Sequence, residues 1–182
     1  MKTIELKKFF DIKTLVLIFS IFNMSPVTAG GAALSDGAII AIYNQVNTFD
    51  IETAGLGVTK SHNKQVIKLA KMVQKDHTAV RQMAADLAIK INVDRTLPAG
   101  RAEAMIEHAQ VYRSLSSKKG SDFDRAYLKH EIAFHTAAIT AVKEALIPSA
   151  KNEELRALMQ KILPGFEHHL QETKRVAKEL GY

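Results

Sequence analysis

The stretch NKQVIKLAKMVQKDHTAVRQMAADLAIKI, residues 63–91, decides the fold. Its apolar side chains recur every three or four residues and form a single stripe that includes one histidine: Val66, Leu69, Val73, His77, Val80, Ala84, Leu87 and Ile91. This spacing is typical of an amphipathic helix with one face in a core. Asn63 stands at the expected N-cap position, so the stretch predicts a long helix that packs against other helices.

The rest of the chain predicts four further helices and no convincing strand. They are expected at about residues 36–60, 101–115, 122–147 and 153–180. The connections after the first and fourth of the five predicted helices are only a few residues long, which favours two antiparallel hairpins. The stretch between the hairpins is long enough to cross the bundle and contains the short helix at 101–115. The expected fold is therefore all-α, a ferritin-like four-helix bundle with one additional short helix in the crossover.

Three local signals predict where the last two long helices begin, end or bend. Ser121 with Asp124 three residues later is a capping signature for the helix at 122–147. Pro148 is expected to end that helix. Pro164-Gly165 lies inside the last helix and predicts a kink or a short break one turn before His169.

The first 29 residues have the pattern of a secretory signal peptide. Four lysines precede an apolar run at 15–22, and small residues lead to a cleavage point after Ala29. The run is shorter than the ~20 residues that span a bilayer. Residues 30–182 are then expected to form a single exported domain without a transmembrane segment, either periplasmic or secreted.

Charge and cysteine content restrict the function. The formal net charge is +6, and removing the four lysines and two acids of the leader lowers it to +4. Basic and acidic residues alternate along the helices without an aromatic and basic stripe, which disfavours a nucleic-acid partner. The chain has no cysteine, which excludes disulfides, iron–sulfur clusters and thiolate zinc sites.

Three histidines lie near the middle of three predicted helices, on the apolar stripe of each. They are His77, His135 and His169, and Asp50 has a similar place in the helix at 36–60. At a rise of ~1.5 Å per residue, the four positions differ by only about 4 Å along the bundle axis. A buried histidine costs free energy unless both ring nitrogens have partners. The pattern therefore predicts either a hydrogen-bond network or a metal ion held between helices.

A carboxylate completes the candidate donor set. Three imidazoles with Asp50 or Asp76 form a nitrogen and oxygen set that suits zinc, copper or iron. His130 lies on another stripe of its helix and is either an auxiliary ligand or a buried partner of Tyr43. The other histidines, His62, His108 and His168, are predicted at the surface, without a ligand role. Four methionines stand at core spacing and are expected to fill the core rather than bind a metal: Met72, Met83, Met105 and Met159.

Four segments resemble an exported bacterial family that carries the domain of unknown function 4142. They are Asn47 through Glu52, Lys71 through His77, Asp122 through Tyr127 leading to His135, and Leu163 through Leu170. The resemblance covers nearly all of residues 30–182 and implies an exported, ferritin-like bundle with no settled activity. The family pattern usually has Glu at the position of Asp50.

Enzymatic functions have little support in the residues. A ferritin-type dinuclear iron site needs Glu-x-x-His pairs, and the chain contains none. It also lacks a Gly-x-Ser-x-Gly turn and a glycine-rich phosphate loop, which disfavours an oxidase or a hydrolase. We therefore expect non-catalytic metal binding, in metal buffering or envelope stress protection. The alternative is a metal-free module that docks an envelope protein and keeps the histidines as a polar network. The metal, the partner and the oligomeric state stay open.

Overall fold

The computed structural model describes residues 34–182, so the predicted signal peptide lies outside the described residues. The described part contains helices and no strand, which confirms the all-α prediction. The elements are α2 (Asp36–Lys60), α3 (Lys64–Lys90), α4 (Arg101–Ser117), α5 (Gly120–Ala141), the π-helical turn η1 (Val142–Leu146), α6 (Ile147–Ser149) and α7 (Glu153–Glu179).

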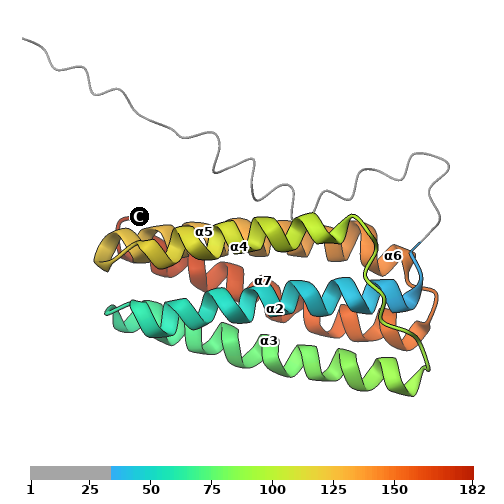
Figure 1. Ribbon diagram of the computed structural model, residues 1–182. Helices are drawn as coiled ribbons and strands as arrows, with labels where there is room; N and C mark the ends of the chain where they lie inside the picture. The colour runs from blue at the N-terminus through green and yellow to red at the C-terminus, as the bar shows by residue number, and fades with distance from the viewer. Residues whose placement is uncertain (1–33) are drawn as a thin grey trace, which may run out of the picture.

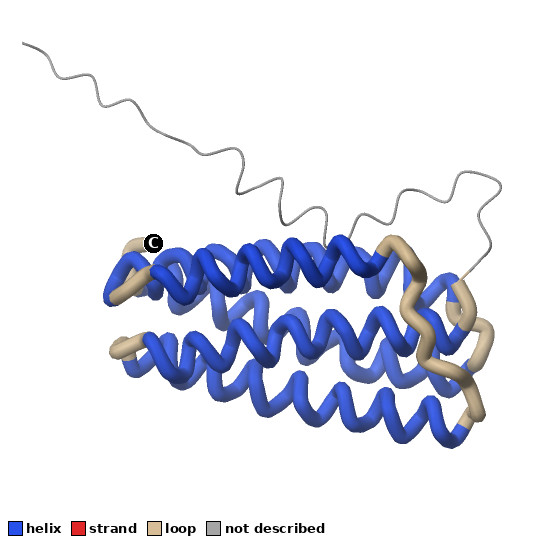
Figure 2. The backbone as a smooth tube through the Cα atoms, viewed as in Figure 1, coloured by secondary structure: helices blue, strands red, loops and turns tan. Residues whose placement is uncertain are grey.

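The long helices α2, α3, α5 and α7 form the bundle and run side by side in Figure 1. α2 packs against α3 and α5 packs against α7, and the two hairpins meet where α3 contacts α7 and α2 contacts α5. α4 lies outside this square, against α2 and α5. The loops gather at the two ends of the bundle, and the longest of them crosses one end between α3 and α4 (Figure 2). None of the described helices is both long and apolar enough to cross a membrane.

Side-chain caps fix the starts of three bundle helices. Ser35, Asn63 and Asn152 each accept hydrogen bonds from backbone N–H groups two or three residues further on. A cap of this type contributes about 1 kcal/mol. The predicted cap at Asn63 is therefore present, and the caps set the helical register of the residues at mid-bundle.

Both predicted ends of the helix at 122–147, which corresponds to α5, are wrong. α5 begins at Gly120, and its N-cap Lys119 makes no side-chain cap. Gly120 has φ 53°, a left-handed value that glycine adopts readily, so the chain turns into α5 ahead of Ser121. At the other end, Pro148 does not stop the helix. The Ile147 N–H bonds to the Val142 carbonyl in a π-turn, and Pro148 falls in the first turn of α6, where its missing N–H is tolerated.

Pro164 does not break α7. The helix is continuous from Glu153 to Glu179, so the predicted short break is absent. Because Pro164 has no N–H, the Gln160 carbonyl lacks its usual partner in the helix. Both residues are exposed. Solvent can therefore hydrate that carbonyl, and the interruption stays local.

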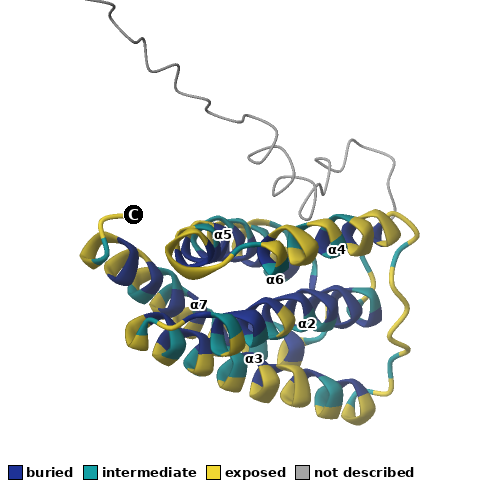
Figure 3. Ribbon diagram, turned by 60° about the vertical axis from the view of Figure 1, so that its left-hand side comes forward, coloured by how far each residue is buried: buried dark blue, intermediate teal, exposed yellow. Residues whose placement is uncertain are grey.

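The core consists of two apolar clusters on either side of a polar layer. The cluster at the crossover end includes Ile39, Phe49, Val80, Phe134, Leu155 and Phe166. The cluster at the other end includes Ala54, Val66, Val73, Phe123, Tyr127, Leu128 and Val176. Buried positions follow the inner faces of the helices, and exposed positions follow the outer faces of α3 and α4 (Figure 3). Each bundle helix therefore passes through a polar layer at its middle.

The methionines are only partly in the core. Met159 is fully buried and Met72 is partly buried against the second cluster. Met83 and Met105 are 38% and 56% exposed, so the prediction that they fill the core is wrong. They lie on outward faces of α3 and α4, and α4 is covered by other helices on one side only.

Gly57 marks a close approach of α2 to α3 and α5. A Cβ atom at this position would lie 2.7 Å from Ala70 Cβ and 2.8 Å from Tyr127 Cζ. We expect Gly57→Ala to lower the free energy of unfolding by about 1–3 kcal/mol, because both neighbours are buried and cannot move freely. Urea unfolding followed by circular dichroism measures the change.

Gly165 is the matched control, because a Cβ atom there meets nothing within 4 Å. Gly165→Ala should raise the stability by up to about 1 kcal/mol, since alanine has the better helix propensity. Equal effects of the two substitutions would contradict the close packing at Gly57.

Candidate metal centre

Each bundle helix contributes one of the predicted ligands to the polar layer. Asp50 comes from α2, His77 from α3, His135 from α5 and His169 from α7, and none is more than 3% exposed. These are four of the six residues predicted as ligands. The structure therefore brings together, in the centre of the bundle, groups that are far apart in the chain.

Asp50 and the imidazoles lie at the spacing of ligands around one ion. His77 Nε2 is 3.0 Å and His135 Nε2 is 3.4 Å from Asp50 Oδ2. His77 Nε2 is 3.2 Å from His169 Nδ1, and donor atoms of the three histidines all lie within 4.8 Å of one another. Ligands at ~2.0–2.1 Å around a tetrahedral zinc ion are themselves about 3.4 Å apart. The cluster is therefore close to the size of a mononuclear site.

The outer nitrogen of each ring has a hydrogen-bond acceptor. His77 Nδ1 is 2.8 Å from Asn47 Oδ1, and the Asn47 amide nitrogen in turn donates to the Tyr43 carbonyl. His135 Nδ1 is 3.1 Å from the backbone carbonyl of Glu131. His169 Nε2 is 3.1 Å from Asp76 Oδ2.

These outer bonds set the tautomers. A ring nitrogen that donates to an oxygen carries the proton of the neutral imidazole, which leaves the other nitrogen as a lone-pair donor. The unprotonated nitrogens are then Nε2 of His77, Nε2 of His135 and Nδ1 of His169, and they converge on the centre. Metal-binding histidines usually have an outer hydrogen bond of this kind, which fixes the ring and its tautomer.

The surroundings disfavour a positive charge on His135 and His169. Burial lowers the pKa of His135 to about 4, although Asp50 opposes the shift. Burial, followed by the charge of His77, also lowers the pKa of His169. Burial alone would raise the pKa of Asp50, but His77 and His135 outweigh it and hold this pKa below its ordinary value. The site therefore favours neutral rings at His135 and His169 beside an ionised Asp50.

Asp76 and Asp50 have different roles. Asp50 is completely buried among the ring nitrogens, whereas the side chain of Asp76 is 48% exposed and meets only the outer nitrogen of His169. Asp50 can therefore serve as a ligand, and Asp76 orients His169. The shorter side chain at position 50 does not prevent contact, because its Oδ2 reaches two imidazoles.

Glu131 is a site residue that the sequence analysis missed. It is 0% exposed, and its carboxylate accepts a hydrogen bond from the Thr53 hydroxyl at 3.3 Å. Asp50, Glu131 and His135 form a second group whose donor atoms lie within 4.8 Å of one another. Burial and the charge of Asp50 raise the pKa of Glu131 well above its usual range. Its position four residues before His135, on the stripe that includes Tyr127, is the signal that could have identified it.

His130 is buried but belongs to neither donor group. Its ring contacts Phe134 at a centroid distance of 5.5 Å, and burial lowers its pKa to about 4. Neither His130 Nε2 nor the Tyr43 hydroxyl has a hydrogen-bond partner within residues 34–182, so the predicted bond between them is wrong. The Tyr43 ring instead contacts Phe166.

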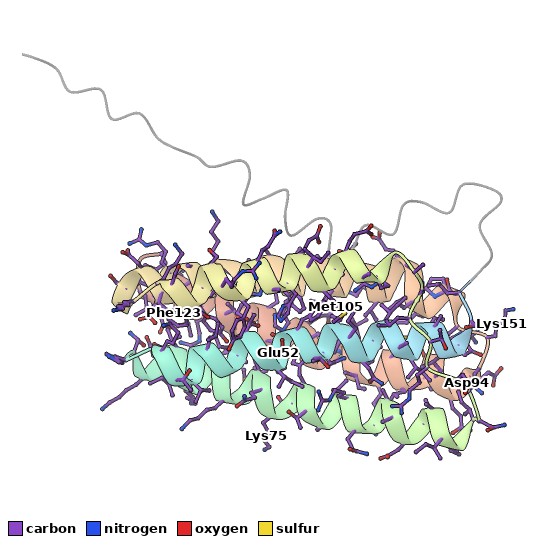
Figure 4. The ribbon with its side chains drawn as sticks, in the orientation of Figure 1. Glu52, Lys75, Asp94, Met105, Phe123 and Lys151 are labelled. Carbon is purple, nitrogen blue, oxygen red and sulfur yellow. The ribbon has the colours of Figure 1, made fainter. Side chains whose placement is uncertain are left out.

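The prediction for His108 is also wrong. It is 6% exposed, stacks on Phe49 at 4.2 Å and lies 2.6 Å from Glu52 Oε2. The reason is that α4 packs on α2 at this point, where Figure 4 labels Glu52 and Met105. His62 and His168 are exposed as predicted.

A small cavity of about 10 Å³ borders the cluster. Its polar walls are Asn47, Asp50, His77 and His135, and apolar side chains of the crossover-end cluster, Phe134 and Phe166 among them, close it. This volume is about that of a single water-sized sphere. The centre can therefore take an ion without a large rearrangement of the core.

Comparison with known proteins identifies the family. The model described as Domain of unknown function (DUF4142) matches residues 23–176. The chain belongs to the DUF4142 family. This confirms the resemblance noted in the sequence. No curated protein matches this DUF4142 chain. A solved structure titled "CopM in the Cu(II)-bound form" is similar, with a TM-score of 0.61, 15% identity, and coverage of 80% of this chain and 98% of that chain. At this identity the likeness concerns the fold, a helical bundle.

The buried histidines predict a loss of stability in acid. The unfolded chain binds protons at histidine near pH 6.5, whereas His130 and His135 resist protonation until about pH 4 in the folded protein. The stability that they contribute is complete above pH 6.5 and decreases as the pH falls toward 4. His169 adds to this trend, and the raised pKa of Glu131 opposes it. Melting temperatures of metal-free protein between pH 7.5 and 4.5 measure the sum.

His130→Gln gives a matched comparison, because it removes one of these groups and leaves the four-residue cluster intact. We expect a shallower decrease of the melting temperature for this variant. A melting temperature that is constant or rises from pH 7 to pH 5 would contradict neutral, buried imidazoles.

Proposed function

We propose that this protein binds a transition metal ion without catalysing a reaction. His77, His135 and His169 are the nitrogen ligands, Asp50 is the oxygen ligand, and Asp76 holds His169 in position. Imidazole and carboxylate donors suit zinc, copper or iron. A neutral set of three imidazoles with one carboxylate also compensates part of the charge of a divalent ion.

One observation carries the proposal. Three imidazoles on three helices have their outer nitrogens bound to oxygen acceptors. The inner nitrogens of His77 and His135 lie next to Asp50 Oδ2, and that of His169 lies 3.2 Å from His77 Nε2. Without an ion, inner nitrogens can bond to Asp50 only if a ring takes up a second proton. Burial disfavours that proton on His135. A metal cation supplies the positive charge that the ring does not.

The proposed role is metal buffering or protection against metal stress in the cell envelope. The pattern of residues 1–29 supports export, with residues 30–182 as one domain in the periplasm or outside the cell. CopM, which shares the fold, is described in a Cu(II)-bound form, and this supports copper as one candidate ion.

A metal-free interaction module is the second candidate. The bonds from His77 through Asn47 to the Tyr43 carbonyl are complete without a metal, so they can also serve a polar network in a protein that docks an envelope partner. Such a network leaves His135 Nε2 and Asp50 Oδ1 without a hydrogen-bond donor or acceptor group beside them in the described part of the chain. Metal binding accounts for these atoms, and we therefore prefer it.

Metal addition should stabilise the protein. At a free zinc or copper(II) concentration of 100 times Kd, the melting temperature should rise by roughly 5 to 10 °C, which corresponds to about 2.7 kcal/mol. His77→Ala removes a ligand and should abolish this rise. Differential scanning calorimetry of chelator-treated protein, and elemental analysis of protein purified from its native source, test this.

His168→Ala is the control, because this exposed histidine is adjacent to His169 in sequence but lies outside the cluster. It should respond to metal like the original protein. The proposal would be contradicted if metal did not raise the melting temperature of the original protein, or if it raised that of His77→Ala by the same amount. A strong response to pH alone would favour the metal-free network.

A further inference from the structure

The donor atoms around Asp50 exceed the needs of a single ion. One group consists of the three histidines, and a second group consists of Asp50, Glu131 and His135, each with donor atoms within 4.8 Å of one another. A tetrahedral ion that takes three imidazoles and one oxygen of Asp50 is already complete. Glu131 and the other oxygen of Asp50 then take no part in binding this ion.

The unused atoms are buried and lack a donor group. Asp50 Oδ1 and Glu131 Oε2 are both inaccessible, and neither accepts a hydrogen bond from a hydroxyl, amide or imidazole group of the described residues. Glu131 Oε1, in contrast, is held by the Thr53 hydroxyl. Buried carboxylate oxygens are costly unless a proton, a donor or a cation satisfies them. The two carboxyl groups share a hydrogen bond in the metal-free protein, and a cation bound by both carboxylates would replace the shared proton.

His135 connects the two groups. Its Nδ1 donates to the Glu131 backbone carbonyl at 3.1 Å and lies 3.6 Å from Glu131 Oε2, so Nε2 is its one ligating nitrogen. That nitrogen is 3.4 Å from Asp50 Oδ2. A carboxylate with two free oxygens can bridge two metal ions about 3.5–4 Å apart. Asp50 is positioned to act as such a bridge, because the histidines of α3 and α5 contact it on one side and Glu131 lies next to it.

We propose that the centre accepts a second metal ion, with Asp50 as the bridge between the two. This inference rests on the proposed function. The first ion alone is held by the three imidazoles and Asp50. When the second ion binds, Glu131 Oε2, Asp50 Oδ1 and His135 Nε2 are its ligands, and His77 and His169 keep the first ion. The second position is richer in oxygen, and it suits zinc, iron or copper(II) rather than copper(I).

The charges of the surrounding residues fit two ions. Asp50, Glu131 and Asp76 together supply three negative charges when ionised, against the four positive charges of two divalent ions. Asp76 is in contact with His169 Nε2, so its charge acts on the first position. The second position has the two buried carboxylates as its direct ligands.

Metal stoichiometry tests this proposal. Native mass spectrometry of metal-free protein with zinc should show two ions per chain at saturation, the second bound more weakly than the first. Glu131→Gln, which keeps the shape and removes the charge, should bind one ion. Glu103→Gln, an exposed position on α4, is the matched control and should bind two.

The outcomes separate the two proposals. One ion in both the original protein and Glu131→Gln overturns the second position and leaves the proposed function intact, whereas no ion in the original protein overturns both. Two ions in Glu131→Gln overturn the assignment to Glu131.

A measurement on the unmodified chain does not depend on the folding of any variant. With copper(II), the electron paramagnetic resonance signal should appear with the first equivalent and weaken with the second, because bridged copper ions couple magnetically. Two equivalents that give twice the uncoupled signal overturn the bridge.

Discussion

The structure depends on a buried layer in which one carboxylate and three imidazoles contact one another. Asp50 has no exposed surface, and its Oδ2 lies 3.0 Å and 3.4 Å from ring nitrogens of His77 and His135. Groups of this polarity cost free energy in an apolar core unless they satisfy one another. The bundle meets this cost by placing all of them in one layer, between two apolar clusters that each helix contributes to.

Helical register determines which residues reach this layer. His77 faces inward, and Lys75, two residues earlier, points away from the bundle on the outer face of α3 (Figure 4). The cap at Asn63 fixes where α3 begins, and hence which residue of α3 reaches mid-bundle. The same logic applies to His169 on α7, whose cap is Asn152. Because hydrogen bonds to Asn47, Asp76 and a backbone carbonyl hold the rings, the centre is ordered before a ligand arrives.

Much of the architecture follows from the sequence because helices are local structures with a strong period. The long helix at residues 63–91 and the convergence of Asp50 and the three histidines at one level were predictable from apolar spacing and helix rise. The helix ends predicted from Ser121 and Pro148 are wrong. The chain turns into the helix at Gly120, which has a left-handed φ, and it forms a π-turn before Pro148; the usual sequence signals indicate neither feature.

The remaining parts of the site depend on packing between helices, which spacing alone does not specify. Glu131 is on the same helical stripe as Tyr127, but only the approach of Thr53 and Asp50 from α2 makes it part of the centre. His108 is buried because α4 lies against Phe49, and His130 is buried without joining the cluster. Ring tautomers likewise depend on acceptors supplied by neighbours in space, such as Asn47.

The most direct test is anomalous diffraction at the zinc absorption edge, from crystals of the protein prepared with one molar equivalent of zinc. The account predicts a single dominant peak at mid-bundle, about 2.0–2.2 Å from His77 Nε2, His135 Nε2, His169 Nδ1 and an oxygen of Asp50. Peaks confined to surface carboxylates or exposed histidines, with the buried rings unchanged, would contradict it.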